Sequence, residues 1–287
     1  IANIDIDATG LSYSNATVVP IEGTATVLWP ESDGITSSQL AALNAARARQ
    51  AAMTLGNRID LEVKVGSSNP QVTIEQSGNY NLIQGLGGGN AIIDGDNNTV
   101  NIKQGSVSGR NLIEFSIVGN TNTVTIWQAR DQTTGMAKAP ESGGHYTGLD
   151  LSGNNNTVTM KQSNDGAASS GHFSLLTVAG STNTISISQA NDNEKRFFGT
   201  VNGNTNSLTA TQQGAGSHYL DITLTGNGQT ATVLQKDAAS HKATVNLINA
   251  GGANSLNLTQ QGATAQSINI TQQCANAAGC SITVTQQ

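Results

Sequence analysis

The chain has 287 residues, of which 11% are charged and 3% aromatic, and its net charge is −6. A chain with so few large hydrophobic side chains must be either disordered or stabilised by dense hydrogen bonding. The negative charge without a Lys/Arg cluster argues against nucleic acid as a partner, and the absence of about 18 consecutive apolar residues argues against a membrane-spanning helix.

Residues 1–70 differ in pattern from the rest of the chain. In chain order, "ANIDID" and "GTATVLW" alternate like strands, a helix is predicted over about 37–55, and "IDLEVKV" returns to alternation. Thr36 and Gln39 are spaced as a capping box, and Gly56 is a natural end of the helix. The start at Ile1 rather than Met suggests a removed targeting peptide, and therefore secretion.

We interpret this region as a small α+β N-terminal cap or adaptor. Its helix has an Ala-rich face with Leu40 and Leu43, which we expect to cover one end of the domain that follows. Arg47 and Arg49 are expected to point outward.

From residue 71 to the C-terminus the sequence repeats itself. The terminal Gln residues of five middle copies are separated by 27, 23, 23 and 25 residues, which is a coil length rather than a helical period. The copies are "GDNNTVNIKQ" (95–104), "GNTNTVTIWQ" (119–128), "GNNNTVTMKQ" (153–162), "GSTNTISISQ" (180–189), "GNTNSLTATQ" (203–212), "GNGQTATVLQ" (226–235), "GGANSLNLTQ" (251–260), "GATAQSINITQ" (262–272) and "AAGCSITVTQ" (277–286).

Each copy alternates as a strand does. Val124, Ile126 and Gln128 fall on one face, and Thr123 and Thr125 on the other. A second alternating segment such as "YTGLDLSG" lies between copies, so each coil has two strands. One coil cannot bury its inner face alone, so we expect an all-β solenoid of about nine stacked coils, on the order of 45 Å long.

The inward Gln at the end of each strand needs hydrogen-bond partners. An unpaired buried amide group costs roughly 1–3 kcal/mol, whereas stacked amides can bond to one another along the axis, as in cross-β ladders. The sequence therefore predicts a core ladder of Gln76, Gln104, Gln128, Gln162, Gln189, Gln212, Gln235, Gln260, Gln272 and Gln286.

Cys274 and Cys280 lie six residues apart across a small-residue turn, which predicts a local disulfide; two free, packed cysteines are the alternative. Their spacing matches no common zinc motif. Asp94 and Asp96 lie in a Gly-rich stretch that resembles a calcium repeat but occurs once, so we interpret it as a turn.

Four histidines recur at coil intervals and are expected to form one column near a turn, with Arg196 in the intervening coil. They are His145, His172, His218 and His241. A transition-metal or anion site at His218 and His241 is one interpretation, and inheritance by repetition is the other. No nucleophile elbow or phosphate-binding loop is present, so we expect no catalytic residue, no metal, no cofactor and no enzymatic activity.

The outward face offers a second class of function. Pairs such as Thr157 with Thr159 and Thr230 with Thr232 form a T-x-T array of the kind that binds ice in some β-solenoids. Thr is also favoured on exposed strands for its own sake. A carbohydrate-binding or adhesin module is a further alternative.

The segment "VTIEQSGNYN" (72–81) carries a strand ending in Gln, a Gly turn and then Asn. It resembles the curlin repeat of bacterial curli, the functional amyloid of the biofilm matrix. The resemblance implies a secreted bacterial subunit at or beyond the cell surface that polymerises end to end, with secretion or nucleation proteins as further partners. The chain is longer than a typical curlin, and the resemblance leaves open whether disordered monomers template one another or folded rods dock.

The chain ends on a strand with full repeat character. An uncapped strand edge offers unpaired backbone groups to a neighbour. We therefore expect the last layer to be unpaired and to form a head-to-tail homopolymer, with "IANIDID" or residues 59–65 of the next copy as its partner. The predicted polymerisation edge is Ser281, Ile282, Thr283, Val284, Thr285, Gln286 and Gln287.

Overall fold

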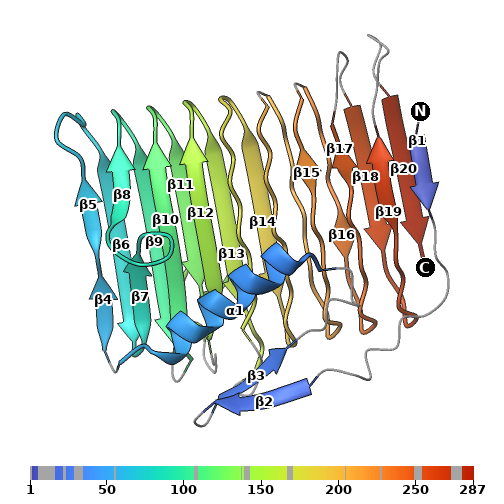
Figure 1. Cartoon of the computed structure of the whole chain (residues 1–287), viewed down its shortest axis with the longest axis horizontal. Helices are drawn as coiled ribbons and strands as arrows, with labels where there is room; N and C mark the ends of the chain where they lie inside the picture. Colours follow the sequence, from blue (N-terminus) through green and yellow to red (C-terminus); the bar gives the residue numbers. More distant parts are fainter. Residues whose placement is uncertain are drawn as a thin grey trace.

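The computed structural model describes a β-solenoid with one helix, as expected from the sequence (Figure 1). It describes residues 2–5, 17–21, 24–28, 35–54, 56–106, 109–136, 138, 143–166, 171–203, 205–226, 228–248, 254–272 and 280–287. Strands stack side by side along the rod, with the first layer at one end and the last layer at the other.

The rod has two long faces. The first, which we call the helix face, contains β4 (Asn57–Ile59), β5 (Leu61–Val63), β7 (Asn81–Gln84), β8 (Ala91–Asp94), β10 (Asn111–Val118), β12 (Tyr146–Ser152), β15 (Thr223–Leu224), β17 (Asn246–Leu247) and β19 (Asn269–Gln272). The second, which we call the glutamine face, contains β6 (Gln71–Gly78), β9 (Thr99–Ser106), β11 (Thr123–Gln128), β13 (Thr157–Ser163), β14 (Thr184–Ala190), β16 (Leu234–Gln235), β18 (Asn254–Gln260) and β20 (Cys280–Gln286).

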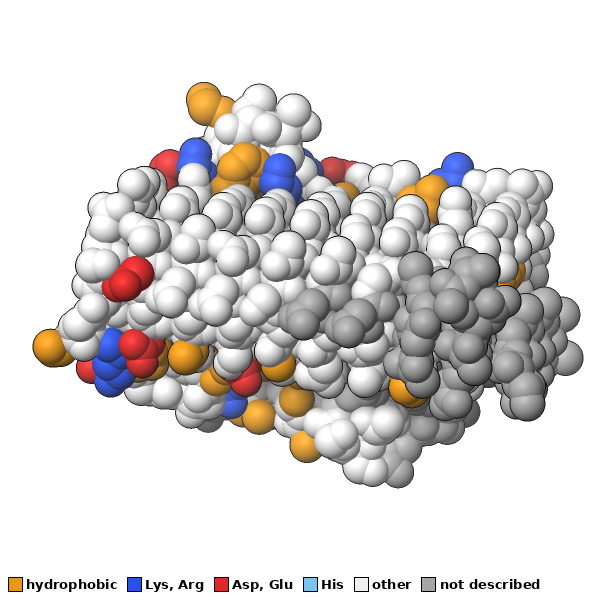
Figure 2. Space-filling model, turned by 90° about the horizontal axis from the view of Figure 1, so that it is seen from above, with side chains coloured by type: hydrophobic (Ala, Val, Ile, Leu, Met, Phe, Trp, Pro, Cys, Tyr) orange, Lys and Arg blue, Asp and Glu red, His pale blue; other side chains and the backbone are white. Residues whose placement is uncertain are grey.

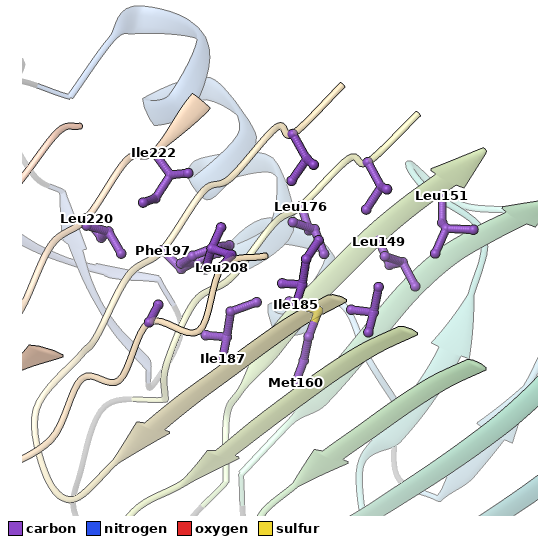
Figure 3. Close-up of a cluster of buried hydrophobic side chains, with 14 of the residues drawn as sticks. Leu149, Leu151, Met160, Leu176, Ile185, Ile187, Phe197, Leu208, Leu220 and Ile222 are labelled. Atoms are coloured by element: carbon purple, nitrogen blue, oxygen red, sulfur yellow. The ribbon is translucent and has the colours of Figure 1, made fainter. Parts of the chain in front are cut away.

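Neighbouring strands on each face are parallel and in register with the sequence repeat. Val124 lies opposite Val158, and Gln128 opposite Gln162. A shift of one residue would turn the apolar set outward, so burial fixes this register. The inward side chains of both faces form one continuous core between the sheets, and Figure 3 shows part of it, with Leu149 and Met160 among the labelled residues.

The turns explain the Gly and Asn that precede each strand. Gly119 has φ +119°, and a Cβ there would lie 2.0 Å from the carbonyl oxygen of Gly153 in the next coil. Buried Asn side chains stack alongside: Asn122 Nδ2 donates to Asn98 Oδ1 at 3.1 Å, and Asn156 Nδ2 donates to Asn122 Oδ1 at 3.1 Å. Only glycine fits where the coils approach so closely, and the Asn side-chain amides supply hydrogen-bond partners for the polar groups of the turn.

About 7 turns are described, slightly fewer than the nine coils expected, although the glutamine face has nine strand layers, one for each glutamine of its column. Nine glutamines stack in one column on the glutamine face, but the first and the last belong to terminal layers with one neighbour each. The seven glutamines between them each have a neighbouring glutamine on both sides.

The helix α1 (Ser37–Ala51) begins at the predicted capping box, in which Thr36 Oγ1 accepts from Gln39 N and Gln39 Oε1 accepts from Thr36 N. It ends at Ala51, earlier than the expected 55. Leu43 and Ala46 are buried.

The helix lies across the side of the rod rather than over one end, which corrects our expectation (Figure 1). The reason is a column of outward aromatic rings on the helix face, which would be exposed without it: Tyr146, Phe173, Phe198 and Tyr219, with neighbouring ring centroids 4.8, 5.4 and 5.7 Å apart. Leu43 of α1 packs in the same cluster as these rings.

The two arginines of the helix also contradict the expectation that they point outward. Arg49 contacts both carboxylate oxygens of the fully buried Glu114 at 2.6 Å, and Arg47 pairs with Glu194 at 2.9 Å. These ion pairs join α1 to coils that are 65 and 147 residues further along the chain.

The first solenoid layer begins inside residues 1–70. β4 pairs in parallel with β7, and β5 with β8. The boundary between the adaptor and the solenoid at residue 70 stays a prediction. β2 (Thr17–Ile21) and β3 (Thr24–Leu28) form an antiparallel pair beside the rod.

The last layer is only half open, which corrects the expectation that it is unpaired. β1 (Ala2–Asp5) pairs antiparallel with β19, with Asn3 opposite Thr271. β20 pairs with β18, and among the described strands none pairs with its other edge. The chain's first strand therefore covers the helix-face half of this end because that edge offers free backbone groups.

Candidate functional site

The glutamine column is the central feature of the rod. Eight hydrogen bonds of 2.8–3.0 Å, each from an Nε2 to the Oε1 of the next coil, join Gln76, Gln104, Gln128, Gln162, Gln189, Gln212, Gln235, Gln260 and Gln286. All eight run in the same direction. One end of the column thus offers an amide hydrogen and the other a carbonyl oxygen.

Five of the seven interior amides, those of Gln104, Gln128, Gln162, Gln189 and Gln260, also donate to a backbone oxygen of the helix face. Gln162 Nε2 donates to the backbone oxygen of Tyr146 at 2.9 Å, and Gln162 Oε1 accepts from Thr147 Oγ1 at 2.6 Å. The buried amide therefore has partners along the axis and across the core, which removes the cost of burying it.

Gln272 does not belong to this column, which corrects the prediction. It ends β19 on the helix face, and the ladder passes directly from Gln260 to Gln286. The segment 262–272 is the second strand of a coil, not a further copy of the first. Its sequence resembles the repeat because both strands of the last coil alternate and end in Gln.

The C-terminal end of the rod carries the predicted polymerisation edge. Along β20 the side chains of Ile282, Val284 and Gln286 are half-buried, while Ser281 and Thr283 are exposed. Ile282 and Val284 pack against the core from one side only. The edge thus presents a core layer covered on one side, beside backbone groups that pair with no strand the structure describes.

The N-terminal end has the matching pattern. In β6, Val72, Ile74 and Gln76 are half-buried and pair with β9 on one side, and no other described strand pairs with β6. Ile59 and Val63 of the same layer are 46% and 41% exposed. Both ends of the solenoid therefore expose apolar side chains that would be buried inside it.

The histidines form a column, but Lys195 rather than Arg196 occupies the intervening coil. His145, His172, Lys195, His218 and His241 follow at 27, 23, 23 and 23 residues, and all five are buried. The rings of His145 and His172 are 5.0 Å apart, and those of His218 and His241 5.2 Å apart and nearly parallel.

These rings serve as hydrogen-bond links between coils. Nδ1 of His145 accepts from His172 N at 3.0 Å, and Nδ1 of His218 accepts from His241 N at 3.3 Å. The Nε2 atoms of His172, His218 and His241 lie 2.8–3.1 Å from the turn carbonyl oxygens of Ser163, Gln213 and Lys236, respectively. A ring that accepts at Nδ1 and donates at Nε2 is neutral and has no lone pair left for a metal, which is the case for His218. Nδ1 of His241 is buried and has no hydrogen-bond partner among the described residues, but without His218 it is a single ligand, so the geometry favours a structural role over a metal site shared by this pair.

Burial keeps His172, His218 and His241 uncharged near neutral pH. It lowers the pKa of His218 to about 3, and with the neighbouring His145 it lowers the pKa of His172 well below its usual value. Burial also lowers the pKa of Lys195 to about 7, while Asp192 and Asp165 act in the opposite direction. Lys195 Nζ donates to backbone oxygens of Asp192, Asn193 and Gly214.

The other predicted positions have structural surroundings. Asp96 Oδ1 accepts from the backbone of Ser68 at 2.6 Å, which lowers its pKa, and Asp94 is exposed in the same turn. Within the described ranges, no group of three or more His, Cys, Asp or Glu side chains could hold a metal ion. Cys274 and the side chain of Cys280 lie outside the described residues, so their disulfide stays a prediction.

The T-x-T columns stack in register on the outside of the glutamine face. Thr157 lies between Thr123 and Thr184, and Thr159 lies beside Thr125. Trp127, between Lys103 and Lys161 on the same face, interrupts the small side chains. Figure 2 shows an adjoining long side of the rod, where uncharged polar groups and backbone predominate.

The comparisons with known proteins give no relative. No family model, curated protein or solved structure matches the chain. None of the helices in the described part of the chain is long and apolar enough to cross a membrane.

Proposed function

We propose that the chain is a structural subunit whose rods stack head to tail, end layer on end layer, into an extracellular bacterial fibre similar to curli. The observation that carries the proposal is the match between the two ends. β20 and β6 have the same alternation, the same half-buried apolar side chains and the same Gln at the ladder position.

The register of the joint follows from the pairing inside the rod. Gln260 lies opposite Gln286, and Gln76 opposite Gln104, so a continued column would place Gln286 of one copy against Gln76 of the next. Val284 would then face Ile74. The ladder would continue through the joint, with an amide hydrogen meeting a carbonyl oxygen.

Such a contact joins two different surfaces of the subunit. Heterologous contacts without rotational closure propagate into open filaments. Strand addition to an exposed edge supplies backbone hydrogen bonds, and the alternating side chains supply specificity. Secretion and the biofilm matrix enter the proposal through the curlin resemblance.

The test is a pair of charge variants in β20 examined by negative-stain electron microscopy. Val284→Lys places a charge in the joint and should leave single rods. Thr283→Lys places the same charge on the outer surface one residue away and should still give filaments. Filaments of normal length from Val284→Lys, or only single rods from the unmodified chain, would refute the proposal.

A second candidate function is ice binding, which the in-register Thr columns favour. It would appear as thermal hysteresis in solutions of single rods. Replacing Thr159 and Thr232 by bulky residues should abolish that activity, whereas changes at the rod ends should not.

A further inference from the structure

The first strand of the chain occupies the place that a stacked neighbour needs. β1 pairs antiparallel with β19 over Ala2–Asp5, whereas the strand pairs within the solenoid that the structure describes are parallel. Figure 1 shows β1 at the C-terminal end of the rod, beyond the last layer. An antiparallel strand cannot continue a parallel coil, so β1 ends the helix face.

β1 also makes the end of the rod uneven. It adds one strand, about 4.8 Å, to the helix face, while β20 on the glutamine face has no described strand beyond it. The first layer of a second copy has β4 and β5 on one face and β6 on the other, at one level. If β6 pairs with β20, the register of the columns places β5 on the edge of β19 that β1 covers and β4 beside residues 266–268, just before β19.

From this juxtaposition we propose that β1 is an intramolecular plug: the β19 edge holds β1 in the free subunit and receives β5 of a second copy in the fibre. The inference rests on the proposed head-to-tail stacking. It adds that stacking requires β1 to leave its own rod. The plug would keep single subunits from joining until β1 is displaced.

Exchanging β1 for a strand of a second copy replaces one set of backbone hydrogen bonds at this edge by another. β1 contributes four residues to the β19 edge, whereas β5 would contribute three there and β4 three more beside residues 266–268. Backbone bonds lost on one strand are regained on the other, and the joint adds the β6–β20 pairing, which β1 does not supply. Stacking should therefore win at high subunit concentration and the plug at low concentration.

A reversible clamp tests the plug in the full chain. Asn3 and Thr271 are directly opposite, and Cα atoms of such pairs are about 4.5–5.5 Å apart, within reach of a disulfide. The variant carries Asn3→Cys and Thr271→Cys, with Cys274→Ser and Cys280→Ser to remove competing thiols. The protein with only the two serine changes is the matched control.

We expect the oxidised clamp to stay as single rods under conditions in which the control forms filaments, and reduction by dithiothreitol to restore assembly. Deleting residues 1–7 should lower the concentration needed for filaments about tenfold or more, the change that about 1.4 kcal/mol of released competition produces. Filaments from the oxidised clamp would overturn the plug and leave head-to-tail stacking standing.

A second measurement keeps the plug testable if no variant assembles. Hydrogen exchange of the backbone amides in Asn269–Gln272 reports directly on whether β1 covers β19 in single rods. Deletion of residues 1–7 should remove the protection of those β19 amides that point toward β1, while amides of Thr157–Ser163 stay protected. Unchanged protection of β19 would overturn the plug; absence of filaments from every protein, with that protection lost, would overturn only the stacking.

Discussion

The substitution Gln162→Leu tests the contribution of the ladder at the middle of the rod. Gln162 Nε2 donates to Gln189 Oε1 at 2.8 Å, and Gln162 Oε1 accepts from Gln128 Nε2 at 3.0 Å and Thr147 Oγ1 at 2.6 Å. Leucine has a similar size but no polar atom. The substitution therefore leaves polar groups above, below and across the core with one partner fewer.

The magnitude follows from the groups that lose partners. Gln189 Oε1 keeps Ser174 Oγ, and Gln128 Nε2 keeps the Leu112 oxygen, so both are only partly deprived. The Thr147 hydroxyl loses the acceptor of its short bond. At about 1–3 kcal/mol for each fully orphaned group, we expect a loss of about 2–4 kcal/mol in the free energy of unfolding.

The matched control is Gln76→Leu at the first rung. Gln76 is half-buried, donates to one neighbouring rung, and its other bonds of 3.3 Å can be replaced by water. In a stacked-repeat protein an end position also disturbs one interface instead of two. We expect a loss below about 1 kcal/mol.

The assay is urea denaturation of single rods, followed by circular dichroism, for both variants and the unmodified chain. The reasoning requires the lower midpoint for Gln162→Leu. Equal midpoints for the two variants, or a Gln162→Leu protein as stable as the unmodified chain, would refute the ladder as a source of stability.

Two further predictions concern the corner of the rod and its turns. The pKa of His218 is about 3 in the folded chain and about 6.5 in an unfolded chain, so the unfolded state binds more protons between these pH values. The contribution of the neutral His218 to the free energy of unfolding is therefore full above pH 6.5 and decreases as the pH falls towards 3. For His218 the decrease should approach about 1.4 kcal/mol per pH unit as the pH falls below 6.5, measured by denaturation between pH 6.5 and 5. A His218→Gln variant should show a shallower dependence, and equal slopes would contradict a neutral His218. Gly119→Ala should cost about 1–3 kcal/mol more than Gly87→Ala, because both glycines have positive φ but only Gly119 would place a Cβ against the next coil. Equal melting temperatures for these two variants would contradict the close approach of the turns.

Much of the solenoid could be predicted from the sequence because its information is local and repeated. The alternation of Val124, Ile126 and Gln128 fixes which face is inward, and the interval between Gln residues fixes the length of a coil. Parallel in-register stacking then leaves one arrangement for each inward column, and the ladder follows from the need to satisfy buried amides.

The errors share one cause, which is that they depend on contacts between distant segments. Arg49 looked exposed because its partner Glu114 lies 65 residues away. The position of α1 depends on outward aromatic rings from four coils, which alternate with inward residues and so carry no distinct signal. Gln272 was misplaced because the two strands of the last coil have nearly the same pattern, and the pairing of β1 with β19 joins opposite ends of the chain.

The most direct test of head-to-tail stacking is electron microscopy of the purified chain over a range of concentrations. We predict unbranched filaments of one rod's width, with strands perpendicular to the axis and a subunit repeat of about 43 Å, nine layers at about 4.8 Å each. Single rods at every concentration, with β1 either present or deleted, would contradict this prediction.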